Sequence, residues 1–317
     1  MRSLNMSESD KHLSVHDSVE DDRNTSIKIY VNGEMVPREH AKVSVYDSGF
    51  MLGDGIWEGM RLHNGSLLFE DVHIARLIAG AKAIDLDIGM TADEISDALR
   101  KTITTNGMHD GVHVRLMVTR GPKRTPFQDP RLSDSGPTVV IIAEYKEASP
   151  EPVEQGIRMF TVHVRRGMPD VQDPKLNSHS KLNCITALIQ AQKAGCDEAL
   201  MLDPHGFVST GNSVNFFIVR NDEVWTSTGD YCMPGITRAK VIELCEQNAI
   251  PVYQRNFSVH DVYSADEAFV TGTFGAQVAV VEVDGRAIGD GRPGPMFEHI
   301  RKLYAELILR ECPPREL

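Results

Sequence analysis

Cysteine is scarce in this chain, which has five cysteines among 317 residues and no two of them spaced as CxxC. Their odd number and scattered positions argue against a disulfide framework, and the lack of close pairs argues against a zinc site. We therefore expect no bound metal and a reducing compartment, which we take to be the cytoplasm.

Positive charge is also in short supply. The chain has 33 lysines and arginines against 45 aspartates and glutamates, which gives a formal net charge of −12. A chain this acidic is a poor partner for nucleic acids and for anionic membranes. No apolar run is long enough to cross a bilayer, and the N-terminus lacks the basic and then apolar pattern of a signal peptide. Small molecules remain as the expected ligands.

What the chain does contain is a mixture of hairpins, strands and a few helices. They do not follow a strict βαβ alternation, so we expect an α+β protein of about two domains. Residues 1–26 are polar and acid-rich, which predicts a disordered acidic tail. The Pro- and Glu-containing stretch 148–156 has the composition of an interdomain linker, so the expected domains span residues 27–147 and 157–317.

Local patterns predict the individual elements. Asn-Gly turns at residues 32–33 and 64–65 mark two hairpins, and alternating residues 43–47 indicate a strand between them. Thr91 and Glu94 form a capping box before a helix that ends near Gly107. Further helices are expected over residues 71–84, 182–194, 238–248 and 295–310, and further strands over residues 112–119, 137–145, 157–164, 198–202, 214–220, 223–227, 267–273 and 277–285.

The stretch CMPGITRAKVIELCEQN, residues 232–248, has the pattern of an anion site. Gly235 makes a turn directly before an amphipathic helix, whose start leaves backbone N–H groups unpaired and carries the positive end of the helix dipole. Thr237 adds a hydroxyl at this place. The alternative is an ordinary glycine turn with Thr237 as the N-cap. The stretch by itself favours this second interpretation, and the other features below change the balance.

Three other features carry chemistry that suits an anionic ligand. Thr271-Gly272-Thr273 places hydroxyls at the tip of an apolar strand, although polar strand ends are common. Arg76 lies on or next to the apolar face of its helix, where an arginine either meets an anion or extends its charged end to solvent. Lys181 stands at the entrance to a helix, where it could act as an amine nucleophile or could simply be solvated.

Taken in order, several segments resemble the class IV (fold type IV) pyridoxal-phosphate aminotransferases. This family includes branched-chain and D-amino-acid aminotransferases, (R)-amine transaminases and aminodeoxychorismate lyase. The resemblance covers nearly everything from residue 27 to about 309. It implies a small N-terminal α/β domain and a larger C-terminal domain with a mixed, barrel-like sheet. The matching segments are GDGIWEGMR (53–61), HIARL (73–77), VRLMVTRG (114–121), KLNCITALIQAQKAGCDEALML (181–202), NSVNFF (212–217), PGITR (234–238) and ADEAFVTGT (265–273).

By this resemblance, Lys181 matches the lysine that forms the Schiff base with pyridoxal 5′-phosphate and later shuttles the α-proton of the substrate. The cofactor supplies the electron sink, and the protein holds its phosphate. The residues that match the phosphate ligands are Arg76, Ile236 and Thr237 (through their N–H groups) and Thr273.

The resemblance also implies a set of substrate-binding residues. An arginine matching Arg115 lies near the substrate carboxylate in branched-chain members, and one matching Arg120 does so in D-amino-acid members. Either arginine could instead form a salt bridge at a strand edge. The remaining candidates for the substrate site are Leu52, Trp57, Gly59, His113 and Phe274.

Two catalytic positions depart from the family pattern. The family has an acidic residue that bonds the pyridine nitrogen of the cofactor, and Thr210 stands in its place in STGNSVNFF. A hydroxyl keeps that nitrogen protonated less well than a carboxylate does, so we expect slower amino transfer. Lys181 lies two residues before Asn183, where the family has three or four. The loop is shortened, or Lys175 takes the role, or the catalytic lysine is lost. We favour Lys181, because Lys175 sits beside Pro174 in a turn.

The expected function is amino transfer between a branched-chain or other apolar amino acid and a 2-oxo acid such as 2-oxoglutarate. Alternatives with the same fold and cofactor are a D-amino-acid or (R)-amine transaminase and a lyase of the aminodeoxychorismate type. A non-enzymatic alternative is a catalytically impaired protein that binds pyridoxal phosphate. The family places its active site between two domains and borrows a loop from a neighbouring subunit. We therefore expect at least a homodimer, with the long loop 121–136 as the borrowed segment.

Overall fold

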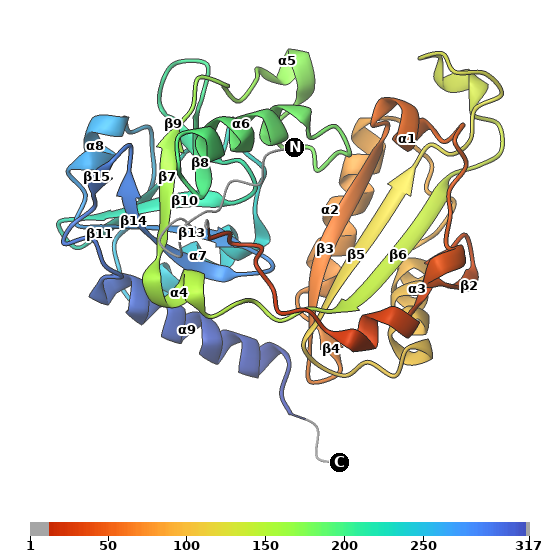
Figure 1. The fold of residues 1–317 in the computed structure, drawn as a ribbon, viewed down its shortest axis with the longest axis horizontal. Coiled ribbons are helices and arrows are strands. Elements are labelled where there is room, and N and C mark those ends of the chain that lie inside the picture. Colours follow the sequence, from red (N-terminus) through yellow and green to blue (C-terminus); the bar gives the residue numbers. More distant parts are fainter. Residues whose placement is uncertain (1–12, 315–317) are drawn as a thin grey trace, which may run out of the picture. The chain divides into compact units, whose positions relative to one another are not determined.

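The computed structural model of the chain describes residues 13–314 (Figure 1). These residues form two compact units. The C-terminal unit comprises residues 13–17, 148–173 and 182–302, and the N-terminal unit comprises residues 18–147, 174–181 and 303–314. The short segment 174–181 therefore belongs to the N-terminal unit, although the segments on both sides of it belong to the other unit.

The N-terminal unit is built on a six-stranded antiparallel sheet with the strand order β2-β1-β6-β5-β3-β4. Both hairpins predicted from Asn-Gly turns are confirmed, and the residues of both turns have positive φ. The strands are β1 (Lys28–Val31), β2 (Glu34–Pro37), β3 (Gly55–His63), β4 (Ser66–Leu67), β5 (Val112–Thr119) and β6 (Thr138–Tyr145).

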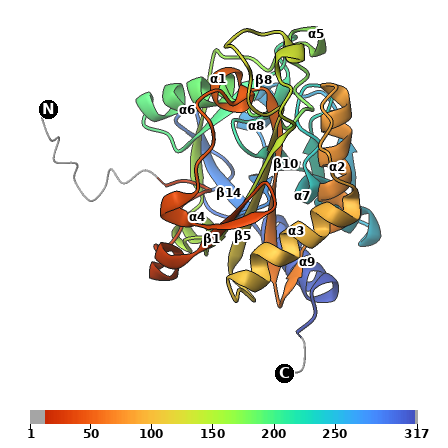
Figure 2. The ribbon, with the colours of Figure 1, turned by 90° about the vertical axis from the view of Figure 1, so that its right-hand side faces the viewer.

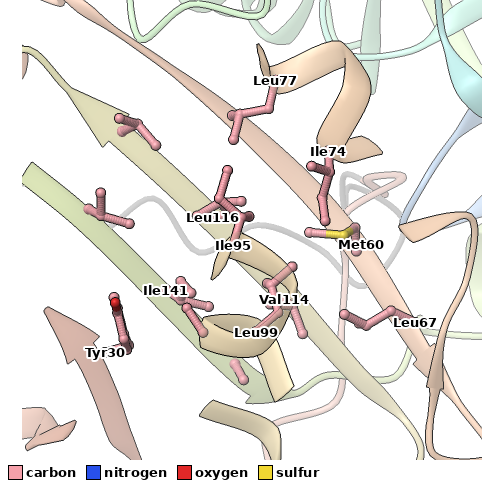
Figure 3. Close-up of a cluster of buried hydrophobic side chains, with 14 of the residues drawn as sticks. Tyr30, Met60, Leu67, Ile74, Leu77, Ile95, Leu99, Val114, Leu116 and Ile141 are labelled. Atoms are coloured by element: carbon pink, nitrogen blue, oxygen red, sulfur yellow. The ribbon is translucent and has the colours of Figure 1, made fainter. Parts of the chain in front are cut away.

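Helices α2 (Glu70–Ala83) and α3 (Ala92–Thr105) cover one face of this sheet (Figure 2). The predicted capping box is confirmed, because the Thr91 hydroxyl and the Glu94 carboxylate each accept a hydrogen bond from the other residue's N–H. Ile74 of α2 lies near Met60 of the sheet, and Leu99 of α3 lies near Val114, in one apolar cluster (Figure 3). Because side chains alternate along a strand, the odd-numbered residues of β3 point to the opposite face.

The C-terminal unit contains a nine-stranded mixed sheet with the order β12-β11-β10-β13-β14-β7-β8-β9, and β15 pairs with β14. The sheet curls, and β9 lies beside β10. One face carries an apolar cluster that includes Phe216, Val270 and Val280. The strands are β7 (Ile157–Thr161), β8 (Glu198–Leu202), β9 (Val208–Gly211), β10 (Asn215–Arg220), β11 (Glu223–Thr226), β12 (Val252–Gln254), β13 (Glu267–Gly272), β14 (Ala276–Val283) and β15 (Arg286–Ala287).

Helices complete the C-terminal unit. The α6 helix packs on β7 and β8, and α7 packs against β13 (Figure 1). On the second face of the sheet, the rings of Phe217 and Phe269 stack with centroids 4.9 Å apart, and Phe297 follows at 5.9 Å from Phe269. The helices are α4 (Glu151–Gln155), α5 (Pro169–Gln172), α6 (Leu182–Lys193), α7 (Ile236–Gln247), α8 (Val259–Tyr263) and α9 (Pro295–Glu311), whose last residues belong to the N-terminal unit.

The expected disordered tail needs correction in its second part. Residues 13–26 are ordered: Val15 is 4% exposed, and a 3₁₀ helix spans Asp22–Ser26. Asn24 also exchanges side-chain hydrogen bonds with the backbone of Tyr145. The acid-rich composition missed these contacts because a few buried side chains suffice to hold a short segment. Residues 1–12 lie outside the described residues.

Two further expectations differ from the structure. Residues 43–47 form no strand, because their apolar side chains Val43 and Val45 remain exposed and pair with no sheet of the described residues. Within the stretch expected as a linker, Glu151–Gln155 form α4. The helix α1 (Ser48–Leu52) follows residues 43–47, and Pro130–Leu132 form a 3₁₀ turn in the loop 121–136. No helix within residues 13–314 is both long and apolar enough to cross a membrane.

Candidate active site

The start of α7 in the C-terminal unit has the features of an anion site. Gly235 is the N-cap, and no side chain in the described part of the chain caps the first N–H groups of the helix. Thr237 is not the N-cap but lies in the first turn, where it is buried. A side chain at position 235 would place its Cβ 2.0 Å from Asn215 Oδ1, so any residue other than glycine would displace the Asn215 side chain. The backbone N–H groups of Ile236 and Thr237 are thus available to an external acceptor.

A row of buried polar side chains runs across the sheet from this turn. Asn215 of β10 stands opposite Thr271 of β13, which stands opposite Gln277 of β14. Asn215 donates to the carbonyl of Met233, just before the turn at Gly235. Within the described residues, Thr271 Oγ1 and Gln277 Nε2 have no hydrogen-bond partner although both are buried. Orphaned buried polar atoms of this kind indicate a water or a ligand that completes them.

The three remaining candidates of this unit lie just after strand β13 and within strand β9. Thr273 and Phe274 follow β13, and Phe274 is buried. Thr210 lies in β9 and is 5% exposed, and its hydroxyl donates to the carbonyl of Val214 at 2.6 Å. Because this proton is already used, Thr210 offers another group only the lone pairs of its oxygen.

Glu198 is a buried carboxyl group in the same unit that the sequence did not reveal. It begins β8 and is 1% exposed. Burial raises the pKa of Glu198 to about 7, against the hydrogen bonds from Asn212 and Ser213, and the charges of Asp197 and Asp17 raise this pKa further. A carboxyl group with this pKa changes its charge near neutral pH.

We predict that Glu198→Gln makes the folded state less sensitive to pH. The folded pKa lies above the unfolded value of 4.5, so the wild type is most stabilised by Glu198 below that value and loses this contribution as pH rises through 7. Between pH 5 and 8 the loss amounts to about 2–3 kcal/mol. Urea unfolding across this range should therefore show that the free energy of unfolding of the variant rises, relative to that of the wild type, by this amount from pH 5 to pH 8. The exposed control Glu246→Gln should show the same pH dependence as the wild type. Parallel pH profiles of Glu198→Gln and the wild type would contradict a raised pKa.

In the N-terminal unit, several predicted site residues gather on the face of the sheet opposite α2 and α3. The Arg115 guanidinium lies 4.3 Å from the centroid of the Trp57 ring, and the Lys181 Nζ lies 5.7 Å from it. Gly59 leaves room for His113, whose ring comes within 3.2 Å of the place where a Cβ at position 59 would stand. The amine of Lys181 and the guanidinium of Arg115 thus both lie within cation–π distance of the Trp57 ring.

Segment 174–181 brings Lys181 to this place. The segment runs along β3, where the Trp57 N–H donates to the carbonyl of Asn177 and the His179 N–H donates to that of Gly55. The side-chain amide of Asn177 also donates to the Trp57 carbonyl at 2.6 Å. Lys175, the alternative lysine, is exposed and comes before this pairing. The backbone pairing therefore fixes Lys181, and not Lys175, beside Trp57.

His179 is a further residue of this cluster that sequence reasoning missed. Its Nε2 lies 3.1 Å from the Ile56 carbonyl, which can only accept, so the proton is on Nε2. Burial lowers the pKa of His179, and the charges of Arg115 and Lys181 lower it further. A neutral imidazole thus lies two residues before the candidate lysine.

The two other arginines of the prediction are bound to carboxylates of their own unit. Arg76 donates through Nε and Nη2 to both oxygens of Glu58, each at 2.7 Å. Arg120 donates to both oxygens of Asp54 and to the carbonyls of Ile84 and Asp85. By contrast, no carboxylate within residues 13–314 forms an ion pair with Arg115, which is exposed on β5.

Glu58 and His73 complete a buried triad with Arg76. The carboxylate is 1% exposed, and the His73 Nδ1 lies 2.7 Å from its Oε2. Burial alone would raise the pKa of Glu58, but the hydrogen bonds and charges of Arg76 and His73 outweigh burial and hold it below its usual value. An acidic residue at an inward position of a strand was the available signal, because such a residue needs a partner.

The family model described as "Amino-transferase class IV" matches residues 55–283. The chain is 40% identical over 287 residues to branched-chain-amino-acid aminotransferase-like protein 2 of Arabidopsis thaliana, which covers 90% of this chain but only 51% of that protein. The chain thus spans about half the length of this relative. It is 39% identical to the putative branched-chain-amino-acid aminotransferase of Methanocaldococcus jannaschii, over 89% of this chain and 96% of the relative. It is 30% identical to the D-alanine aminotransferase of Bacillus licheniformis, over 90% of this chain and 98% of the relative.

Solved structures of branched-chain aminotransferases have the same fold as this chain. Branched-chain amino acid aminotransferase of Escherichia coli superposes with a TM-score of 0.84 at 28% identity, over 90% of this chain and 96% of that one. The T.th. branched-chain enzyme with pyridoxamine 5′-phosphate superposes with a TM-score of 0.85 at 28% identity, over 91% and 96% of the two chains. The predicted α+β, fold type IV architecture is thereby confirmed. Because the family model matches most of the chain and the alignments to relatives span nine-tenths of it, the protein belongs to the class IV aminotransferases.

Proposed function

We propose that the protein is a pyridoxal 5′-phosphate-dependent transaminase that exchanges an amino group between a branched-chain or other apolar amino acid and a 2-oxo acid such as 2-oxoglutarate. The observation that carries this proposal is the placement of the Lys181 amine and the Arg115 guanidinium over the ring of Trp57. The names of the Methanocaldococcus and Escherichia coli proteins support the branched-chain substrate.

The C-terminal unit fits the phosphate and ring of this cofactor. The uncapped N–H groups of Ile236 and Thr237 suit a phosphate, because they are fixed donors at the positive end of a helix. Thr271 and Gln277 present buried polar atoms without partners in the described part of the chain, as a site that receives a polar ligand would. The cofactor, when bound, withdraws electrons from the substrate α-carbon.

The proposed roles of the cluster around Trp57 follow from its chemistry. Lys181 carries the cofactor and moves the α-proton, because a primary amine is a nucleophile and a base. Arg115 binds the substrate carboxylate, since it is exposed and has no carboxylate partner within residues 13–314. Trp57 offers an apolar surface to the side chain of the substrate. Arg120 is the weaker candidate for the carboxylate, because Asp54 and two carbonyls already occupy its donors.

Thr210, in place of the acidic residue of the family, limits the rate of the proposed amino transfer. A hydroxyl that donates to Val214 can accept a weak hydrogen bond from a pyridine N–H, but it carries no charge to hold the proton there. We propose that amino transfer proceeds with a weaker electron sink and is correspondingly slow. We propose that Arg76, which Glu58 holds in place, and Thr273 complete the phosphate site.

We also propose that the protein is a homodimer. Leu182, Ile185 and Ile189 form an exposed apolar stripe on one side of α6, with 75%, 54% and 45% of their surface exposed. In the N-terminal unit, Phe50 and Phe127 are 72% and 62% exposed. Such surfaces are costly in water and are typical of subunit interfaces. Phe127 lies in the loop 121–136, which is the segment proposed to reach a neighbouring subunit. The five free cysteines suit the proposed cytoplasmic location.

A second candidate is D-amino-acid transamination. It is favoured by the 30% identity to D-alanine aminotransferases over nine-tenths of the chain. The two candidates differ in the handedness of the amino donor, which one set of half-reactions distinguishes.

We predict that the purified protein, incubated with pyridoxal 5′-phosphate, shows a visible absorbance band that L-leucine and L-valine remove. Loss of the band with D-alanine alone would favour the second candidate, and loss with (R)-1-phenylethylamine alone would favour an amine transaminase. Reduction with borohydride followed by peptide mass spectrometry should place the cofactor on Lys181. Absence of both the band and a modified lysine would contradict the proposed cofactor.

A further inference from the structure

A short segment at the start of the described chain, Leu13–Asp17, packs on the C-terminal unit, and we call it the strap. It is folded compactly, because the Ser14 N–H donates to the Asp17 carboxylate at 2.7 Å and the Asp17 N–H donates to the Ser14 carbonyl at 3.0 Å. Val15 is 4% exposed and belongs to the apolar cluster of the curled sheet. The strap is therefore an integral part of the packed unit.

Both ends of the strap are held by hydrogen bonds. At one end, the Leu13 N–H donates to the buried carboxylate of Asp197 at 3.0 Å. At the other end, the Asp17 carbonyl accepts from the Ser149 N–H at 2.9 Å. The residues between these two anchors, including His16, are thus kept in one place.

His16 contacts two turns, one that follows the strand of Thr210 and one that contains Phe274. Its Nε2 lies 3.0 Å from the Ser213 hydroxyl, in the turn between β9 and β10 that follows Thr210. Its ring lies 6.3 Å from the ring of Phe274, centroid to centroid, in the turn between β13 and β14. One side chain therefore bridges the two turns.

The backbone beneath the strap is shaped to accept it. At Gly275, directly after Phe274, an added Cβ would stand 3.1 Å from the Val15 carbonyl oxygen. That distance is shorter than a comfortable contact, so a side chain here would push the strap away. The turn after β13 and the strap thus fit each other closely.

We propose that the strap, through His16, fixes the position of Phe274 and thereby sets which amino-acid side chains the protein accepts. This inference rests on the proposed function, which makes Phe274 a part of the substrate site. Phe274 follows a strand end, and a contact from a second segment fixes a ring at such a place more firmly than a turn does by itself. With His16 against its ring, the phenyl group presents one shape to the substrate, and that shape discriminates between large and small side chains.

Hydrogen exchange on the full-length protein tests the hold of the strap directly. In His16→Ala, the amides of residues 211–214 and 273–276 should exchange at least about threefold faster than in the wild type. The free energy of local opening is lower in the variant, because opening no longer has to break the contacts of His16. His260→Ala, at an exposed histidine of the same unit, should leave these amides unchanged. Equal exchange in His16→Ala and the wild type would overturn the proposal, whether or not the protein is an active transaminase.

Kinetics test the effect on selectivity. The ratio of kcat/KM for leucine to that for alanine should fall about two- to tenfold in His16→Ala, mainly through KM, because one ring contact is lost. His16→Phe keeps a ring against Phe274 and should restore most of the ratio. Ser213→Ala removes the hydrogen bond to His16, and the one to Glu198, but leaves both rings in place, so it should change the ratio less.

The outcomes separate the inference from the function on which it rests. An unchanged ratio in His16→Ala, in an active protein, overturns the inference and leaves the proposed function intact. Failure of His16→Phe to restore the ratio would also overturn it, since a purely structural anchor would not depend on the ring. A wild type that transaminates no donor would refute the proposed function, and hydrogen exchange would still decide whether the strap holds the turns.

Discussion

Replacing Lys181 by alanine is expected to abolish amino transfer, with a fall in kcat of about 10⁴-fold or more. The variant loses both the amine that carries the cofactor and the base that moves the α-proton. The rate at which L-leucine removes the visible absorbance band, measured in a stopped-flow instrument, gives this fall directly. The geometry behind the prediction is the pairing of residues 177–179 with β3, which fixes Lys181 over Trp57.

Lys175→Ala is the matched control for this experiment. Lys175 is exposed and lies before the paired segment, so its loss should change the rate by less than about twofold. Unaltered activity in Lys181→Ala together with a loss in Lys175→Ala would transfer the role to Lys175. Added methylamine distinguishes the loss of the amine from a disturbance of the fold, because it should restore part of the rate in Lys181→Ala if only the amine is missing.

Much of the fold follows from local patterns that do not depend on distant contacts. The Asn-Gly turns, the Thr91–Glu94 capping box and the apolar face of α2 each decide their own structure, and each is confirmed. Residues 43–47 show the limit of such patterns. Their alternation suits a strand, but only the end of the stretch finds a partner, in an isolated bridge between Asp47 and Pro122. Val43 and Val45 stay exposed, and a strand needs backbone partners along its length.

The candidate site was predictable in its residue types but not in its pairings. The family resemblance assigned Arg76 to the cofactor phosphate and Arg115 or Arg120 to the substrate carboxylate, without showing which of the three is already paired with a carboxylate of the chain. Their difference depends on the position of carboxylates far away in the sequence: Glu58 lies 18 residues from Arg76, and Asp54 lies 66 residues from Arg120. His16 and Ser213, which are 197 residues apart, are the extreme case. No sequence period reports such contacts, because they depend on how strands are ordered in the sheet.

Glu58→Gln is expected to lower the free energy of unfolding by about 3 kcal/mol. The substitution keeps the size of the side chain, but it leaves the Arg76 charge and the His73 N–H facing a neutral amide in a buried place. Urea unfolding at pH 7 measures the change. Because the folded pKa of Glu58 is lowered, its contribution is present above the unfolded value of 4.5 and is lost as pH falls below it. The difference between the variant and the wild type should therefore shrink in acid.

Glu144→Gln provides the control, because Glu144 faces Arg38 at 3.9 Å on the exposed side of the same unit and should cost less than about 0.5 kcal/mol. Equal effects of the two substitutions would contradict a buried triad. A double-mutant cycle with Arg76→Gln then separates the two roles of Arg76. If Arg76 only neutralises Glu58, the double variant should recover stability and retain the cofactor as the wild type does. If Arg76 also binds the phosphate, the double variant should recover stability and still release the cofactor more readily. We expect the more ready release of the cofactor, because Glu58 binds Arg76 through Nε and Nη2 and thereby orients the remaining N–H groups of the guanidinium toward another anion.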